Sequence, residues 1–145
     1  MNLYFVDSNI WLYGFIQNQK PKDAAKHPAS KSLLQSLPKD KLFISTQVIN
    51  EVCKNLIKKA SFTEQHIEIL IRNFYSDYQV IELNKDILLR ASELRQRYHF
   101  SFWDGLIVAS ALYRNATIIY SEDMQSGLMV EGQVKIVNPF TNQNL

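Results

Sequence analysis

Two aspartates in this sequence lie just beyond apolar runs that predict buried strands. Asp7 directly follows Leu3–Val6, and Asp123 lies shortly after the β-branched run Thr117–Tyr120. If the two strands are parallel neighbours, their backbones lie about 5 Å apart. Their carboxyl ends then meet at the edge where open α/β sheets form ligand sites.

Two further acids belong to predicted helices that begin near the same edge. Asp104 opens a helix predicted over 103–114, and Glu51 lies in the second turn of a helix predicted over 46–60. Carboxylates that gather in one place repel one another, and their pKa values rise unless a cation compensates. Oxygen ligands without histidine or cysteine suit Mg²⁺ or Mn²⁺, ions that activate water and stabilise charge on a phosphoryl oxygen. The four acids therefore suggest hard-metal chemistry on a phosphate ester.

Each acid also has an ordinary structural interpretation. Asp7 could cap the next helix, Glu51 could be solvated on the polar side of its helix, and Asp123 could be a turn residue. Ser101 and Asp104 match the Ser/Thr-x-x-Asp/Glu capping pattern. Spacing by itself leaves these interpretations open.

The elements that must position these acids alternate between short strands and helices, which predicts an α/β fold with a parallel sheet. The helix over 103–114 has almost no polar face, so we expect it to be largely buried. Thr63, with Glu64 beside it, is a candidate helix cap. Predicted strands cover 3–6, 42–45, 80–83, 117–120 and 134–137, and predicted helices cover 8–17, 29–36, 46–60, 63–75, 87–98 and 103–114.

Composition argues against several other classes of protein. The single cysteine, Cys53, allows no internal disulfide, and the three histidines show no zinc-ligand spacing. Four glycines leave no glycine-rich phosphate loop. No apolar run is long enough for a membrane span, and the first residues lack the basic region of a signal peptide. We therefore expect a globular protein of the cytoplasm.

Charge divides the chain into two parts. Residues 1–60 carry nine lysines against four acids, a net charge of +5, whereas residues 61–145 carry seven basic residues against ten acids, a net charge of −3. A lysine-rich segment can attract phosphate backbones, or it can be an ordinary solvated surface.

Four segments, in their order along the chain, resemble the PIN-domain ribonucleases. In size the chain is most similar to the VapC-type toxins of toxin–antitoxin pairs. The segments combine a strand-end aspartate, an early helix with a glutamate, a late Asp-x-Leu-Ile helix and a Ser-x-Asp turn, and they are Phe5–Asn9, Ser45–Glu51, Phe102–Ala111 and Ile119–Asp123.

The resemblance implies a three-layer PIN-like α/β fold. In this fold a central parallel sheet of about five strands, in the order 3-2-1-4-5, is flanked by helices. It also implies a single nuclease domain over 1–140 with a polar tail over 141–145.

The resemblance further implies a magnesium or manganese site. The first, third and fourth acids anchor the metal and the glutamate supports a second ion or its waters, so the expected catalytic and metal-binding residues are Asp7, Glu51, Asp104 and Asp123. Asn9 and Ser121 match the polar positions that brace the first and last acids. Glu122 could exchange roles with its neighbour, although the resemblance favours Asp123.

The implied function is a metal-dependent endoribonuclease, the toxin of a type II toxin–antitoxin system. The expected substrate is single-stranded or looped RNA, cleaved to 5′-phosphate and 3′-hydroxyl ends. The expected partners are a small antitoxin and a second copy of the chain, and the candidates for contacts with the RNA backbone are Lys54, Lys58 and Lys59. The role of Gln17–His27 does not transfer with the resemblance.

Three alternatives compete with this function. An RNA-processing PIN nuclease outside a toxin–antitoxin pair would use the same acids. A non-catalytic PIN-like scaffold would need none of them. An aspartyl-nucleophile phosphatase normally has a second aspartate as general acid two residues after the first, where this chain has Asn9.

Overall fold

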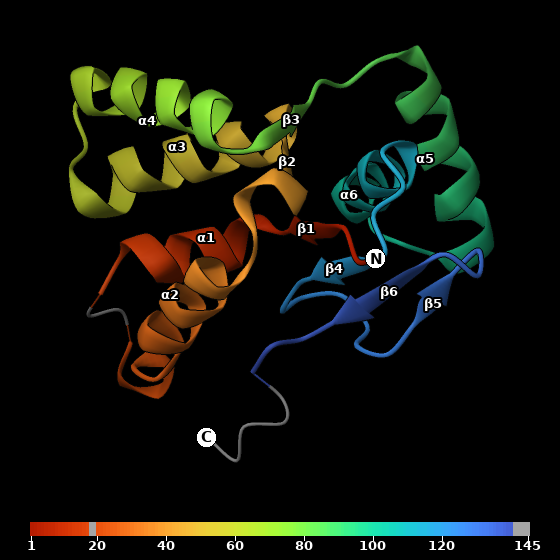
Figure 1. Cartoon of the computed structure of the whole chain (residues 1–145), viewed down its shortest axis with the longest axis horizontal. Coiled ribbons are helices and arrows are strands. Elements are labelled where there is room, and N and C mark those ends of the chain that lie inside the picture. The colour runs from red at the N-terminus through yellow and green to blue at the C-terminus, as the bar shows by residue number, and fades with distance from the viewer. Residues whose placement is uncertain (18–19, 141–145) are drawn as a thin grey trace.

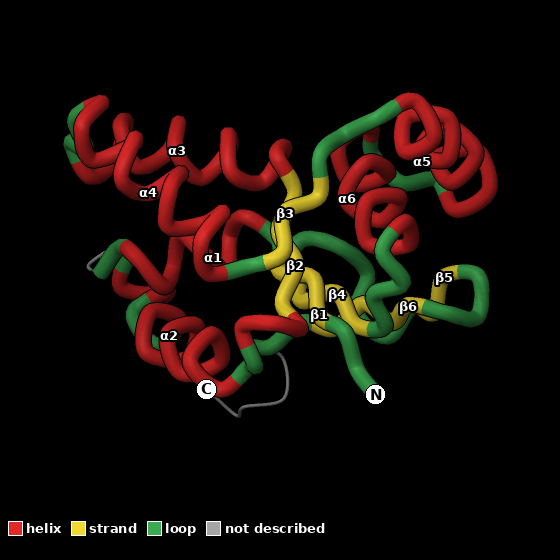
Figure 2. The backbone as a smooth tube through the Cα atoms, turned by 45° about the horizontal axis from the view of Figure 1, so that its top comes forward, coloured by secondary structure: helices red, strands yellow, loops and turns green. Residues whose placement is uncertain are grey.

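The computed structural model describes residues 1–17 and 20–140, which form a sheet between two layers of helices (Figure 1). Helices α1 to α4 lie on one side of the strands and α5 and α6 on the other (Figure 2). No helix in the described ranges is both long and apolar enough to cross a bilayer. The elements are β1 (Tyr4–Val6), α1 (Ser8–Phe15), α2 (Lys26–Ser36), β2 (Leu42–Ser45), α3 (Thr46–Ala60), α4 (Glu64–Asp77), β3 (Gln79–Ile81), α5 (Lys85–Tyr98), α6 (Phe102–Tyr113), β4 (Ile118–Tyr120), β5 (Met129–Val130) and β6 (Val134–Val137), with 3-10 turns at Pro21–Asp23 and Lys39–Lys41.

The sheet has the strand order β3-β2-β1-β4-β6-β5. The first four pairings are parallel and β5 pairs antiparallel with β6. The predicted order of five parallel strands is confirmed, with β6 as the predicted fifth strand. The β5 strand was not predicted, because its two residues are too few to show an alternating pattern. This short strand covers an edge that β6 would otherwise expose.

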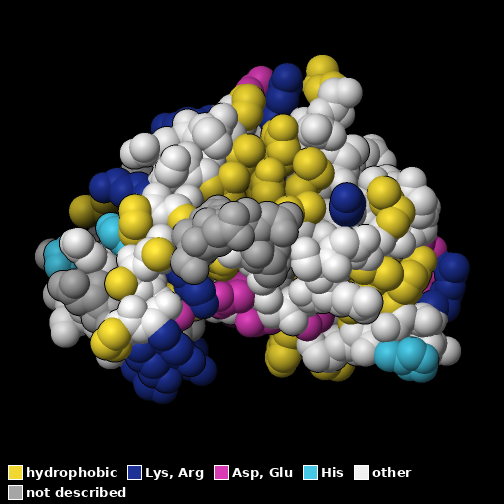
Figure 3. Space-filling view, turned by 90° about the horizontal axis from the view of Figure 1, so that it is seen from below, with side chains coloured by type: hydrophobic (Ala, Val, Ile, Leu, Met, Phe, Trp, Pro, Cys, Tyr) yellow, Lys and Arg dark blue, Asp and Glu magenta, His cyan; other side chains and the backbone are white. Residues whose placement is uncertain are grey.

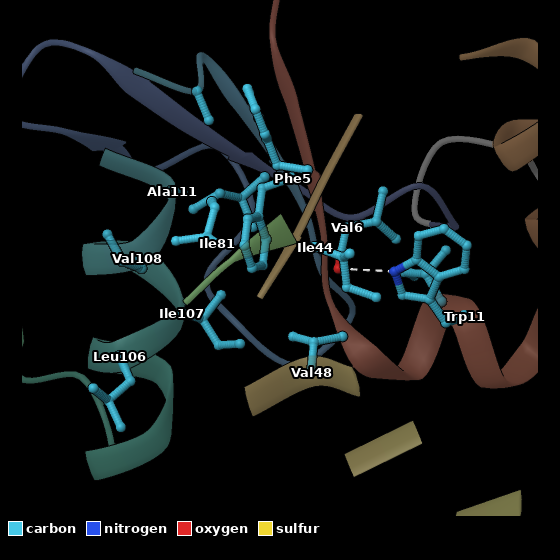
Figure 4. Close-up of a cluster of buried hydrophobic side chains, with 14 of the residues drawn as sticks. Phe5, Val6, Trp11, Ile44, Val48, Ile81, Leu106, Ile107, Val108 and Ala111 are labelled. Carbon is cyan, nitrogen blue, oxygen red and sulfur yellow. Dashed lines mark hydrogen bonds between the residues drawn. The ribbon is translucent and has the colours of Figure 1, made fainter. Parts of the chain in front are cut away.

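The core packs the apolar face of the sheet against α6, as Figure 4 shows. The predicted burial of this helix is confirmed, since every residue from Gly105 to Leu112 is buried. On the other side of the sheet, the Trp11 indole Nε1 donates to the Val6 carbonyl oxygen over 3.1 Å (Figure 4). That bond joins the second turn of α1 to the end of β1, and Asp7 lies between them.

Four helix starts differ from the predicted ones: α5 begins at Lys85 and α6 at Phe102, two and one residues early, α4 begins at Glu64, one residue late, and α2 differs most. Helix α2 begins at Lys26, three residues earlier than predicted, and includes Pro28 in its first turn. Proline is accepted there because the first backbone N–H groups of a helix have no intrahelical partner. Thr63 caps α4 as predicted, and the His66 side chain accepts from the Thr63 backbone N–H in return.

Candidate active site

The register between β1 and β4 places Asp7 beside Ser121. Val6 pairs with Tyr120, and the Asp7 backbone N–H donates to the Tyr120 carbonyl oxygen over 2.9 Å. Asp7 and Ser121, which directly follow the two strands, therefore lie side by side. The Ser121 hydroxyl donates to Asp7 Oδ2 over 2.8 Å. Asp7 Oδ1 accepts from the Ser8 backbone N–H over 2.7 Å, so Asp7 also caps α1. The capping role and a site role are thus compatible.

Asn9 brings Asp123 to the same edge of the sheet. The Asn9 side-chain amide, in the first turn of α1, donates to Asp123 Oδ2 over 2.5 Å. Asp123 itself is exposed in the turn after β4. The two bracing positions implied by the sequence resemblance, Asn9 and Ser121, therefore contact the last and the first acid respectively.

Glu51 and Asp104 approach this edge from two different helices. Ser45, the last residue of β2, caps α3 by accepting from the Val48 backbone N–H, so α3 begins directly at the carboxyl end of β2. Glu51 lies in the second turn of α3 and is half-buried, and the Ser8 side chain at the start of α1 lowers its pKa. Glu51 is therefore not simply a solvated residue on the polar side of its helix.

The Ser101 hydroxyl accepts from the Asp104 backbone N–H over 3.2 Å at the start of α6, as the capping pattern predicted. Gly105 allows this helix start to approach α5, because a Cβ there would lie 2.7 Å from Arg95 Cγ. Asp104 is thereby held half-buried at the edge of the site.

Electrostatics links the acids to one another. Burial raises the pKa of Asp7 to about 6 from 3.8; hydrogen bonds from Ser121 and Ser8 oppose this rise in pKa. The negative charges of Glu51 and Asp104 raise the pKa of Asp7 further. Burial also raises the pKa of Glu51, and the charge of Asp104 adds to it. The pKa of Asp104 is raised by burial and then by the charge of Asp123.

Glu122 is engaged by other residues. Its carboxylate forms a close ion pair with the Lys26 ammonium on α2 and accepts from the Tyr13 hydroxyl over 2.8 Å. Lys26 also pairs with Asp23 at 2.9 Å. A carboxylate already neutralised by lysine is a poorer ligand for a cation than one without a positive neighbour. The structure therefore favours Asp123 over Glu122 as the fourth acid.

The four acids fit a hard cation in their chemistry. Within the ranges that the structure describes, no three His, Cys, Asp or Glu side chains already stand in an arrangement that holds a metal ion. The site is thus a group of mutually repelling carboxylates rather than a formed coordination shell. A divalent cation would offset the repulsion that raises the pKa values of these groups, and their oxygens are the ligands that Mg²⁺ and Mn²⁺ prefer.

The three lysine candidates lie along α3 and are exposed. Lys54 lines the same cavity as Glu51, whereas Lys58 and Lys59 lie in the last turn of the helix. On the face shown in Figure 3, acidic side chains gather near the centre and a dense group of Lys and Arg side chains lies to the lower left. Acidic and basic side chains thus occupy separate parts of this face.

The sequence analysis did not single out Gln47 as a residue of the site. Its side chain lowers the pKa of Glu51, and its Nε2 donates to the Trp103 carbonyl oxygen over 3.4 Å. Its position four residues before Glu51 on one helix was the available signal, since such residues share a face.

Comparisons with known proteins agree with this architecture. Similar solved structures include a toxin–antitoxin complex from Klebsiella pneumoniae, with 23% identity, a TM-score of 0.69, and coverage of 94% of this chain and 98% of that chain. VapC20 from Mycobacterium tuberculosis, described as a sarcin–ricin loop cleaving toxin, has 20% identity, a TM-score of 0.66, and coverage of 83% and 89%. VapBC2 from Rickettsia felis, bound to a DNA fragment from its promoter, has 20% identity, a TM-score of 0.59, and coverage of 83% and 88%. At these identities the likeness establishes the fold.

A search of curated protein sequences finds no match. The sequence model of the PIN domain, in contrast, matches residues 4–125. This match spans most of the chain and includes all four acids as well as Asn9 and Ser121. The chain therefore belongs to the PIN domain family.

Proposed function

We propose that this protein is an endoribonuclease that depends on Mg²⁺ or Mn²⁺ and serves as the toxin of a toxin–antitoxin pair. The observation that carries the proposal is the meeting of acids from four separate segments at the carboxyl edge of the sheet. Asp7 and Asp123 are braced by Ser121 and Asn9, and burial and mutual charge raise the pKa values of Asp7, Glu51 and Asp104. A group of acids that costs stability in this way is best explained by a positively charged ligand.

In this function the chain's own residues hold and orient the reacting groups. Asp7, Asp104 and Asp123 would hold the metal, and Glu51 would position a second ion or a water. When bound, Mg²⁺ or Mn²⁺ supplies activation of water and neutralisation of charge on the phosphate. Ser121 keeps Asp7 oriented through the 2.8 Å hydrogen bond and lowers its pKa, which favours the anionic form that a cation needs.

The RNA substrate and the antitoxin partner rest on the structural neighbours, and the homodimer rests on the sequence resemblance. One neighbour is described as a toxin that cleaves the sarcin–ricin loop, and another is a toxin–antitoxin complex. We infer that this chain cleaves single-stranded or looped RNA, assembles as a homodimer and is held inactive by a small antitoxin.

The direct test is cleavage of total RNA and of end-labelled stem–loops by the purified chain. With millimolar Mg²⁺ or Mn²⁺ we expect discrete cuts that leave 5′-phosphate and 3′-hydroxyl ends, and with a chelator we expect none. Intact RNA in both conditions, or cuts that persist with the chelator, would reject the proposed activity.

Replacing Lys54, Lys58 and Lys59 with alanine should weaken RNA binding and its dependence on salt. Each lysine that contacts a phosphate of single-stranded RNA contributes about 0.7 to the slope of log affinity against log salt, so the triple variant should lose about 2. The measurement is RNA affinity in chelator at several salt concentrations. Lys135→Ala, an exposed lysine of β6, is the control, and an unchanged slope in the triple variant would remove α3 from the RNA-binding surface.

A further inference from the structure

A cavity of about 510 Å³ lies beside Glu51, between α3 and the start of α6. Four of its lining residues, Gln47, Asn50, Glu51 and Lys54, follow the spacing i, i+3, i+4, i+7 and so share one face of α3. The opposite wall is Trp103, the residue before Asp104. The cavity is therefore continuous with the candidate active site but extends beyond its four acids.

Trp103 forms an exposed aromatic wall of this cavity, and Phe102 and Arg95 support it. Its side chain is 58% exposed, although it is a large hydrophobic residue. Its ring contacts the Phe102 ring edge-on, with centroids 5.1 Å apart. The Arg95 guanidinium lies 4.2 Å from the centroid of the Phe102 ring, and its Nη1 donates to the Phe102 carbonyl oxygen over 3.0 Å. Because these contacts already restrain the Trp103 side chain, it loses less conformational entropy when a ligand stacks on it.

Gln47, which lines the same cavity, has a buried acceptor without a hydrogen-bond partner in the part of the chain that the structure describes. Its side chain is only 7% exposed, and its Oε1 has no hydrogen-bond partner among the described residues. The other end of this amide is used, because Nε2 donates to the Trp103 carbonyl oxygen. A buried acceptor without a donor costs free energy, and a ligand that donates to it recovers that cost.

We propose that this cavity is a nucleotide subsite of the nuclease, in which the base next to the cleaved phosphate stacks on Trp103. Gln47 Oε1 accepts a hydrogen bond from that nucleotide, either from a base N–H or from the ribose 2′-hydroxyl. The Lys54 ammonium pairs with its phosphate. The inference rests on the proposed function, since it names the part of the site that selects an unstacked nucleotide.

A nucleotide suits the cavity better than an apolar side chain of a protein partner. The walls combine one aromatic face and the Leu83 side chain with two amides, a hydroxyl, an ammonium and a carboxylate, and stacking on aromatic rings is how proteins hold unpaired bases. An apolar occupant would leave the Gln47 acceptor unpaired and would desolvate both the Lys54 ammonium and the Glu51 carboxylate.

Tryptophan fluorescence tests the stacking without any need for catalysis. The chain has two tryptophans, and Trp11 is buried at 2% exposure, so a ligand in the cavity should quench Trp103 alone. A short single-stranded RNA, added in chelator, should quench the wild-type emission in a saturable way. The Trp103→Ala variant should show no such quenching. Quenching by antitoxin peptide but not by RNA would overturn the proposal in favour of a protein-docking surface.

Cleavage kinetics test the same subsite in the active protein. Trp103→Ala should raise KM about tenfold to a hundredfold with a smaller change in kcat, and Trp103→Phe should recover most of the loss. The control is Tyr113→Ala, an equally exposed aromatic at the other end of α6. In a substrate series with one abasic nucleotide each, wild type should lose rate sharply at one position beside the cut, and Trp103→Ala should lose little there. A 2′-deoxy substitution at that position separates the two possible donors to Gln47.

The two proposals fail in different ways. If wild type cleaves RNA but Trp103→Ala has the same KM and the same abasic profile, the subsite is wrong and the nuclease function stands. If wild type does not cleave RNA and RNA does not quench Trp103, both are wrong. Quenching without cleavage retains the stacking of a base on Trp103 but rejects both the nuclease and the placement of that base beside a cleaved phosphate.

Discussion

Asp104→Asn is expected to reduce metal-dependent RNA cleavage by about 10³-fold or more, and Asp7→Asn by a similar factor. Asparagine keeps the size and much of the hydrogen bonding of aspartate but removes the negative charge that a divalent cation requires. The fold should tolerate Asp104→Asn, because the Ser101 cap of α6 bonds the backbone N–H of residue 104. The measurement is the single-turnover rate at saturating Mn²⁺, with circular dichroism as the check on folding.

The matched control is Asp40→Asn, which changes an exposed aspartate in the turn before β2. Its rate should equal that of wild type. A folded Asp104→Asn variant that cleaves within tenfold of wild type would show that the chemistry occurs elsewhere on the molecule. Glu122→Gln provides a further comparison, because Glu122 is paired with Lys26; its rate should fall far less than that of Asp104→Asn.

Asp7→Asn is also expected to stabilise the protein in chelator, by roughly 3 kcal/mol near neutral pH. Asp7 is 6% exposed, and burial raises its pKa to about 6 from the 3.8 of an ordinary aspartate. The difference of about two units, at 1.36 kcal/mol per unit, is the free energy that the buried charge costs the folded state. Asparagine avoids that cost while it can still pair with Ser8 and Ser121.

The pH dependence has a definite sign. Between about pH 4 and pH 6 the folded state keeps the Asp7 proton and the unfolded state does not, so the wild-type free energy of unfolding falls as pH rises. Asp7→Asn should lack the part of this decline that comes from Asp7. The two proteins should therefore have similar free energies of unfolding near pH 4 and different ones by pH 7. Urea unfolding in chelator across this range measures the difference.

Divalent cations should raise the stability of wild type but not that of Asp7→Asn. Because a ligand that binds only the folded state stabilises it, millimolar Mn²⁺ should raise the melting temperature of wild type at neutral pH. It should leave Asp7→Asn almost unchanged. Asp86→Asn, at an exposed position on α5, should respond to Mn²⁺ as wild type does. An equal response in Asp7→Asn would place the binding of Mn²⁺ away from Asp7.

Most of the fold was predictable because its elements have local signals. The apolar runs before Asp7 and before Ser121 marked β1 and β4, and the apolar periodicity of 46–60 marked α3 in full. The start of α2 was predicted too late, since Pro28 looks like a helix breaker but occupies the first turn. The β5 strand has no periodicity to read.

The candidate site was predictable in its residue types but not in all its partners. The positions of Asp7, Glu51, Asp104 and Asp123 at element ends followed from the strand and helix pattern. The pairing of Glu122 with Lys26 did not, because it joins the turn after β4 to α2 across 96 positions of sequence. The cavity beside Trp103 was equally invisible, since it depends on how α3 packs near the start of α6.

The sequence by itself determined where strands end and helices begin, because apolar spacing, caps and prolines act over a few residues. It thereby placed acids at those ends. Only the tertiary structure decided which of them meet. Asp7 and Ser121, and likewise Asn9 and Asp123, are 114 positions apart, and each pair forms because β1 and β4 are parallel neighbours in one register. Such contacts depend on the order and alignment of whole strands, which no local pattern encodes.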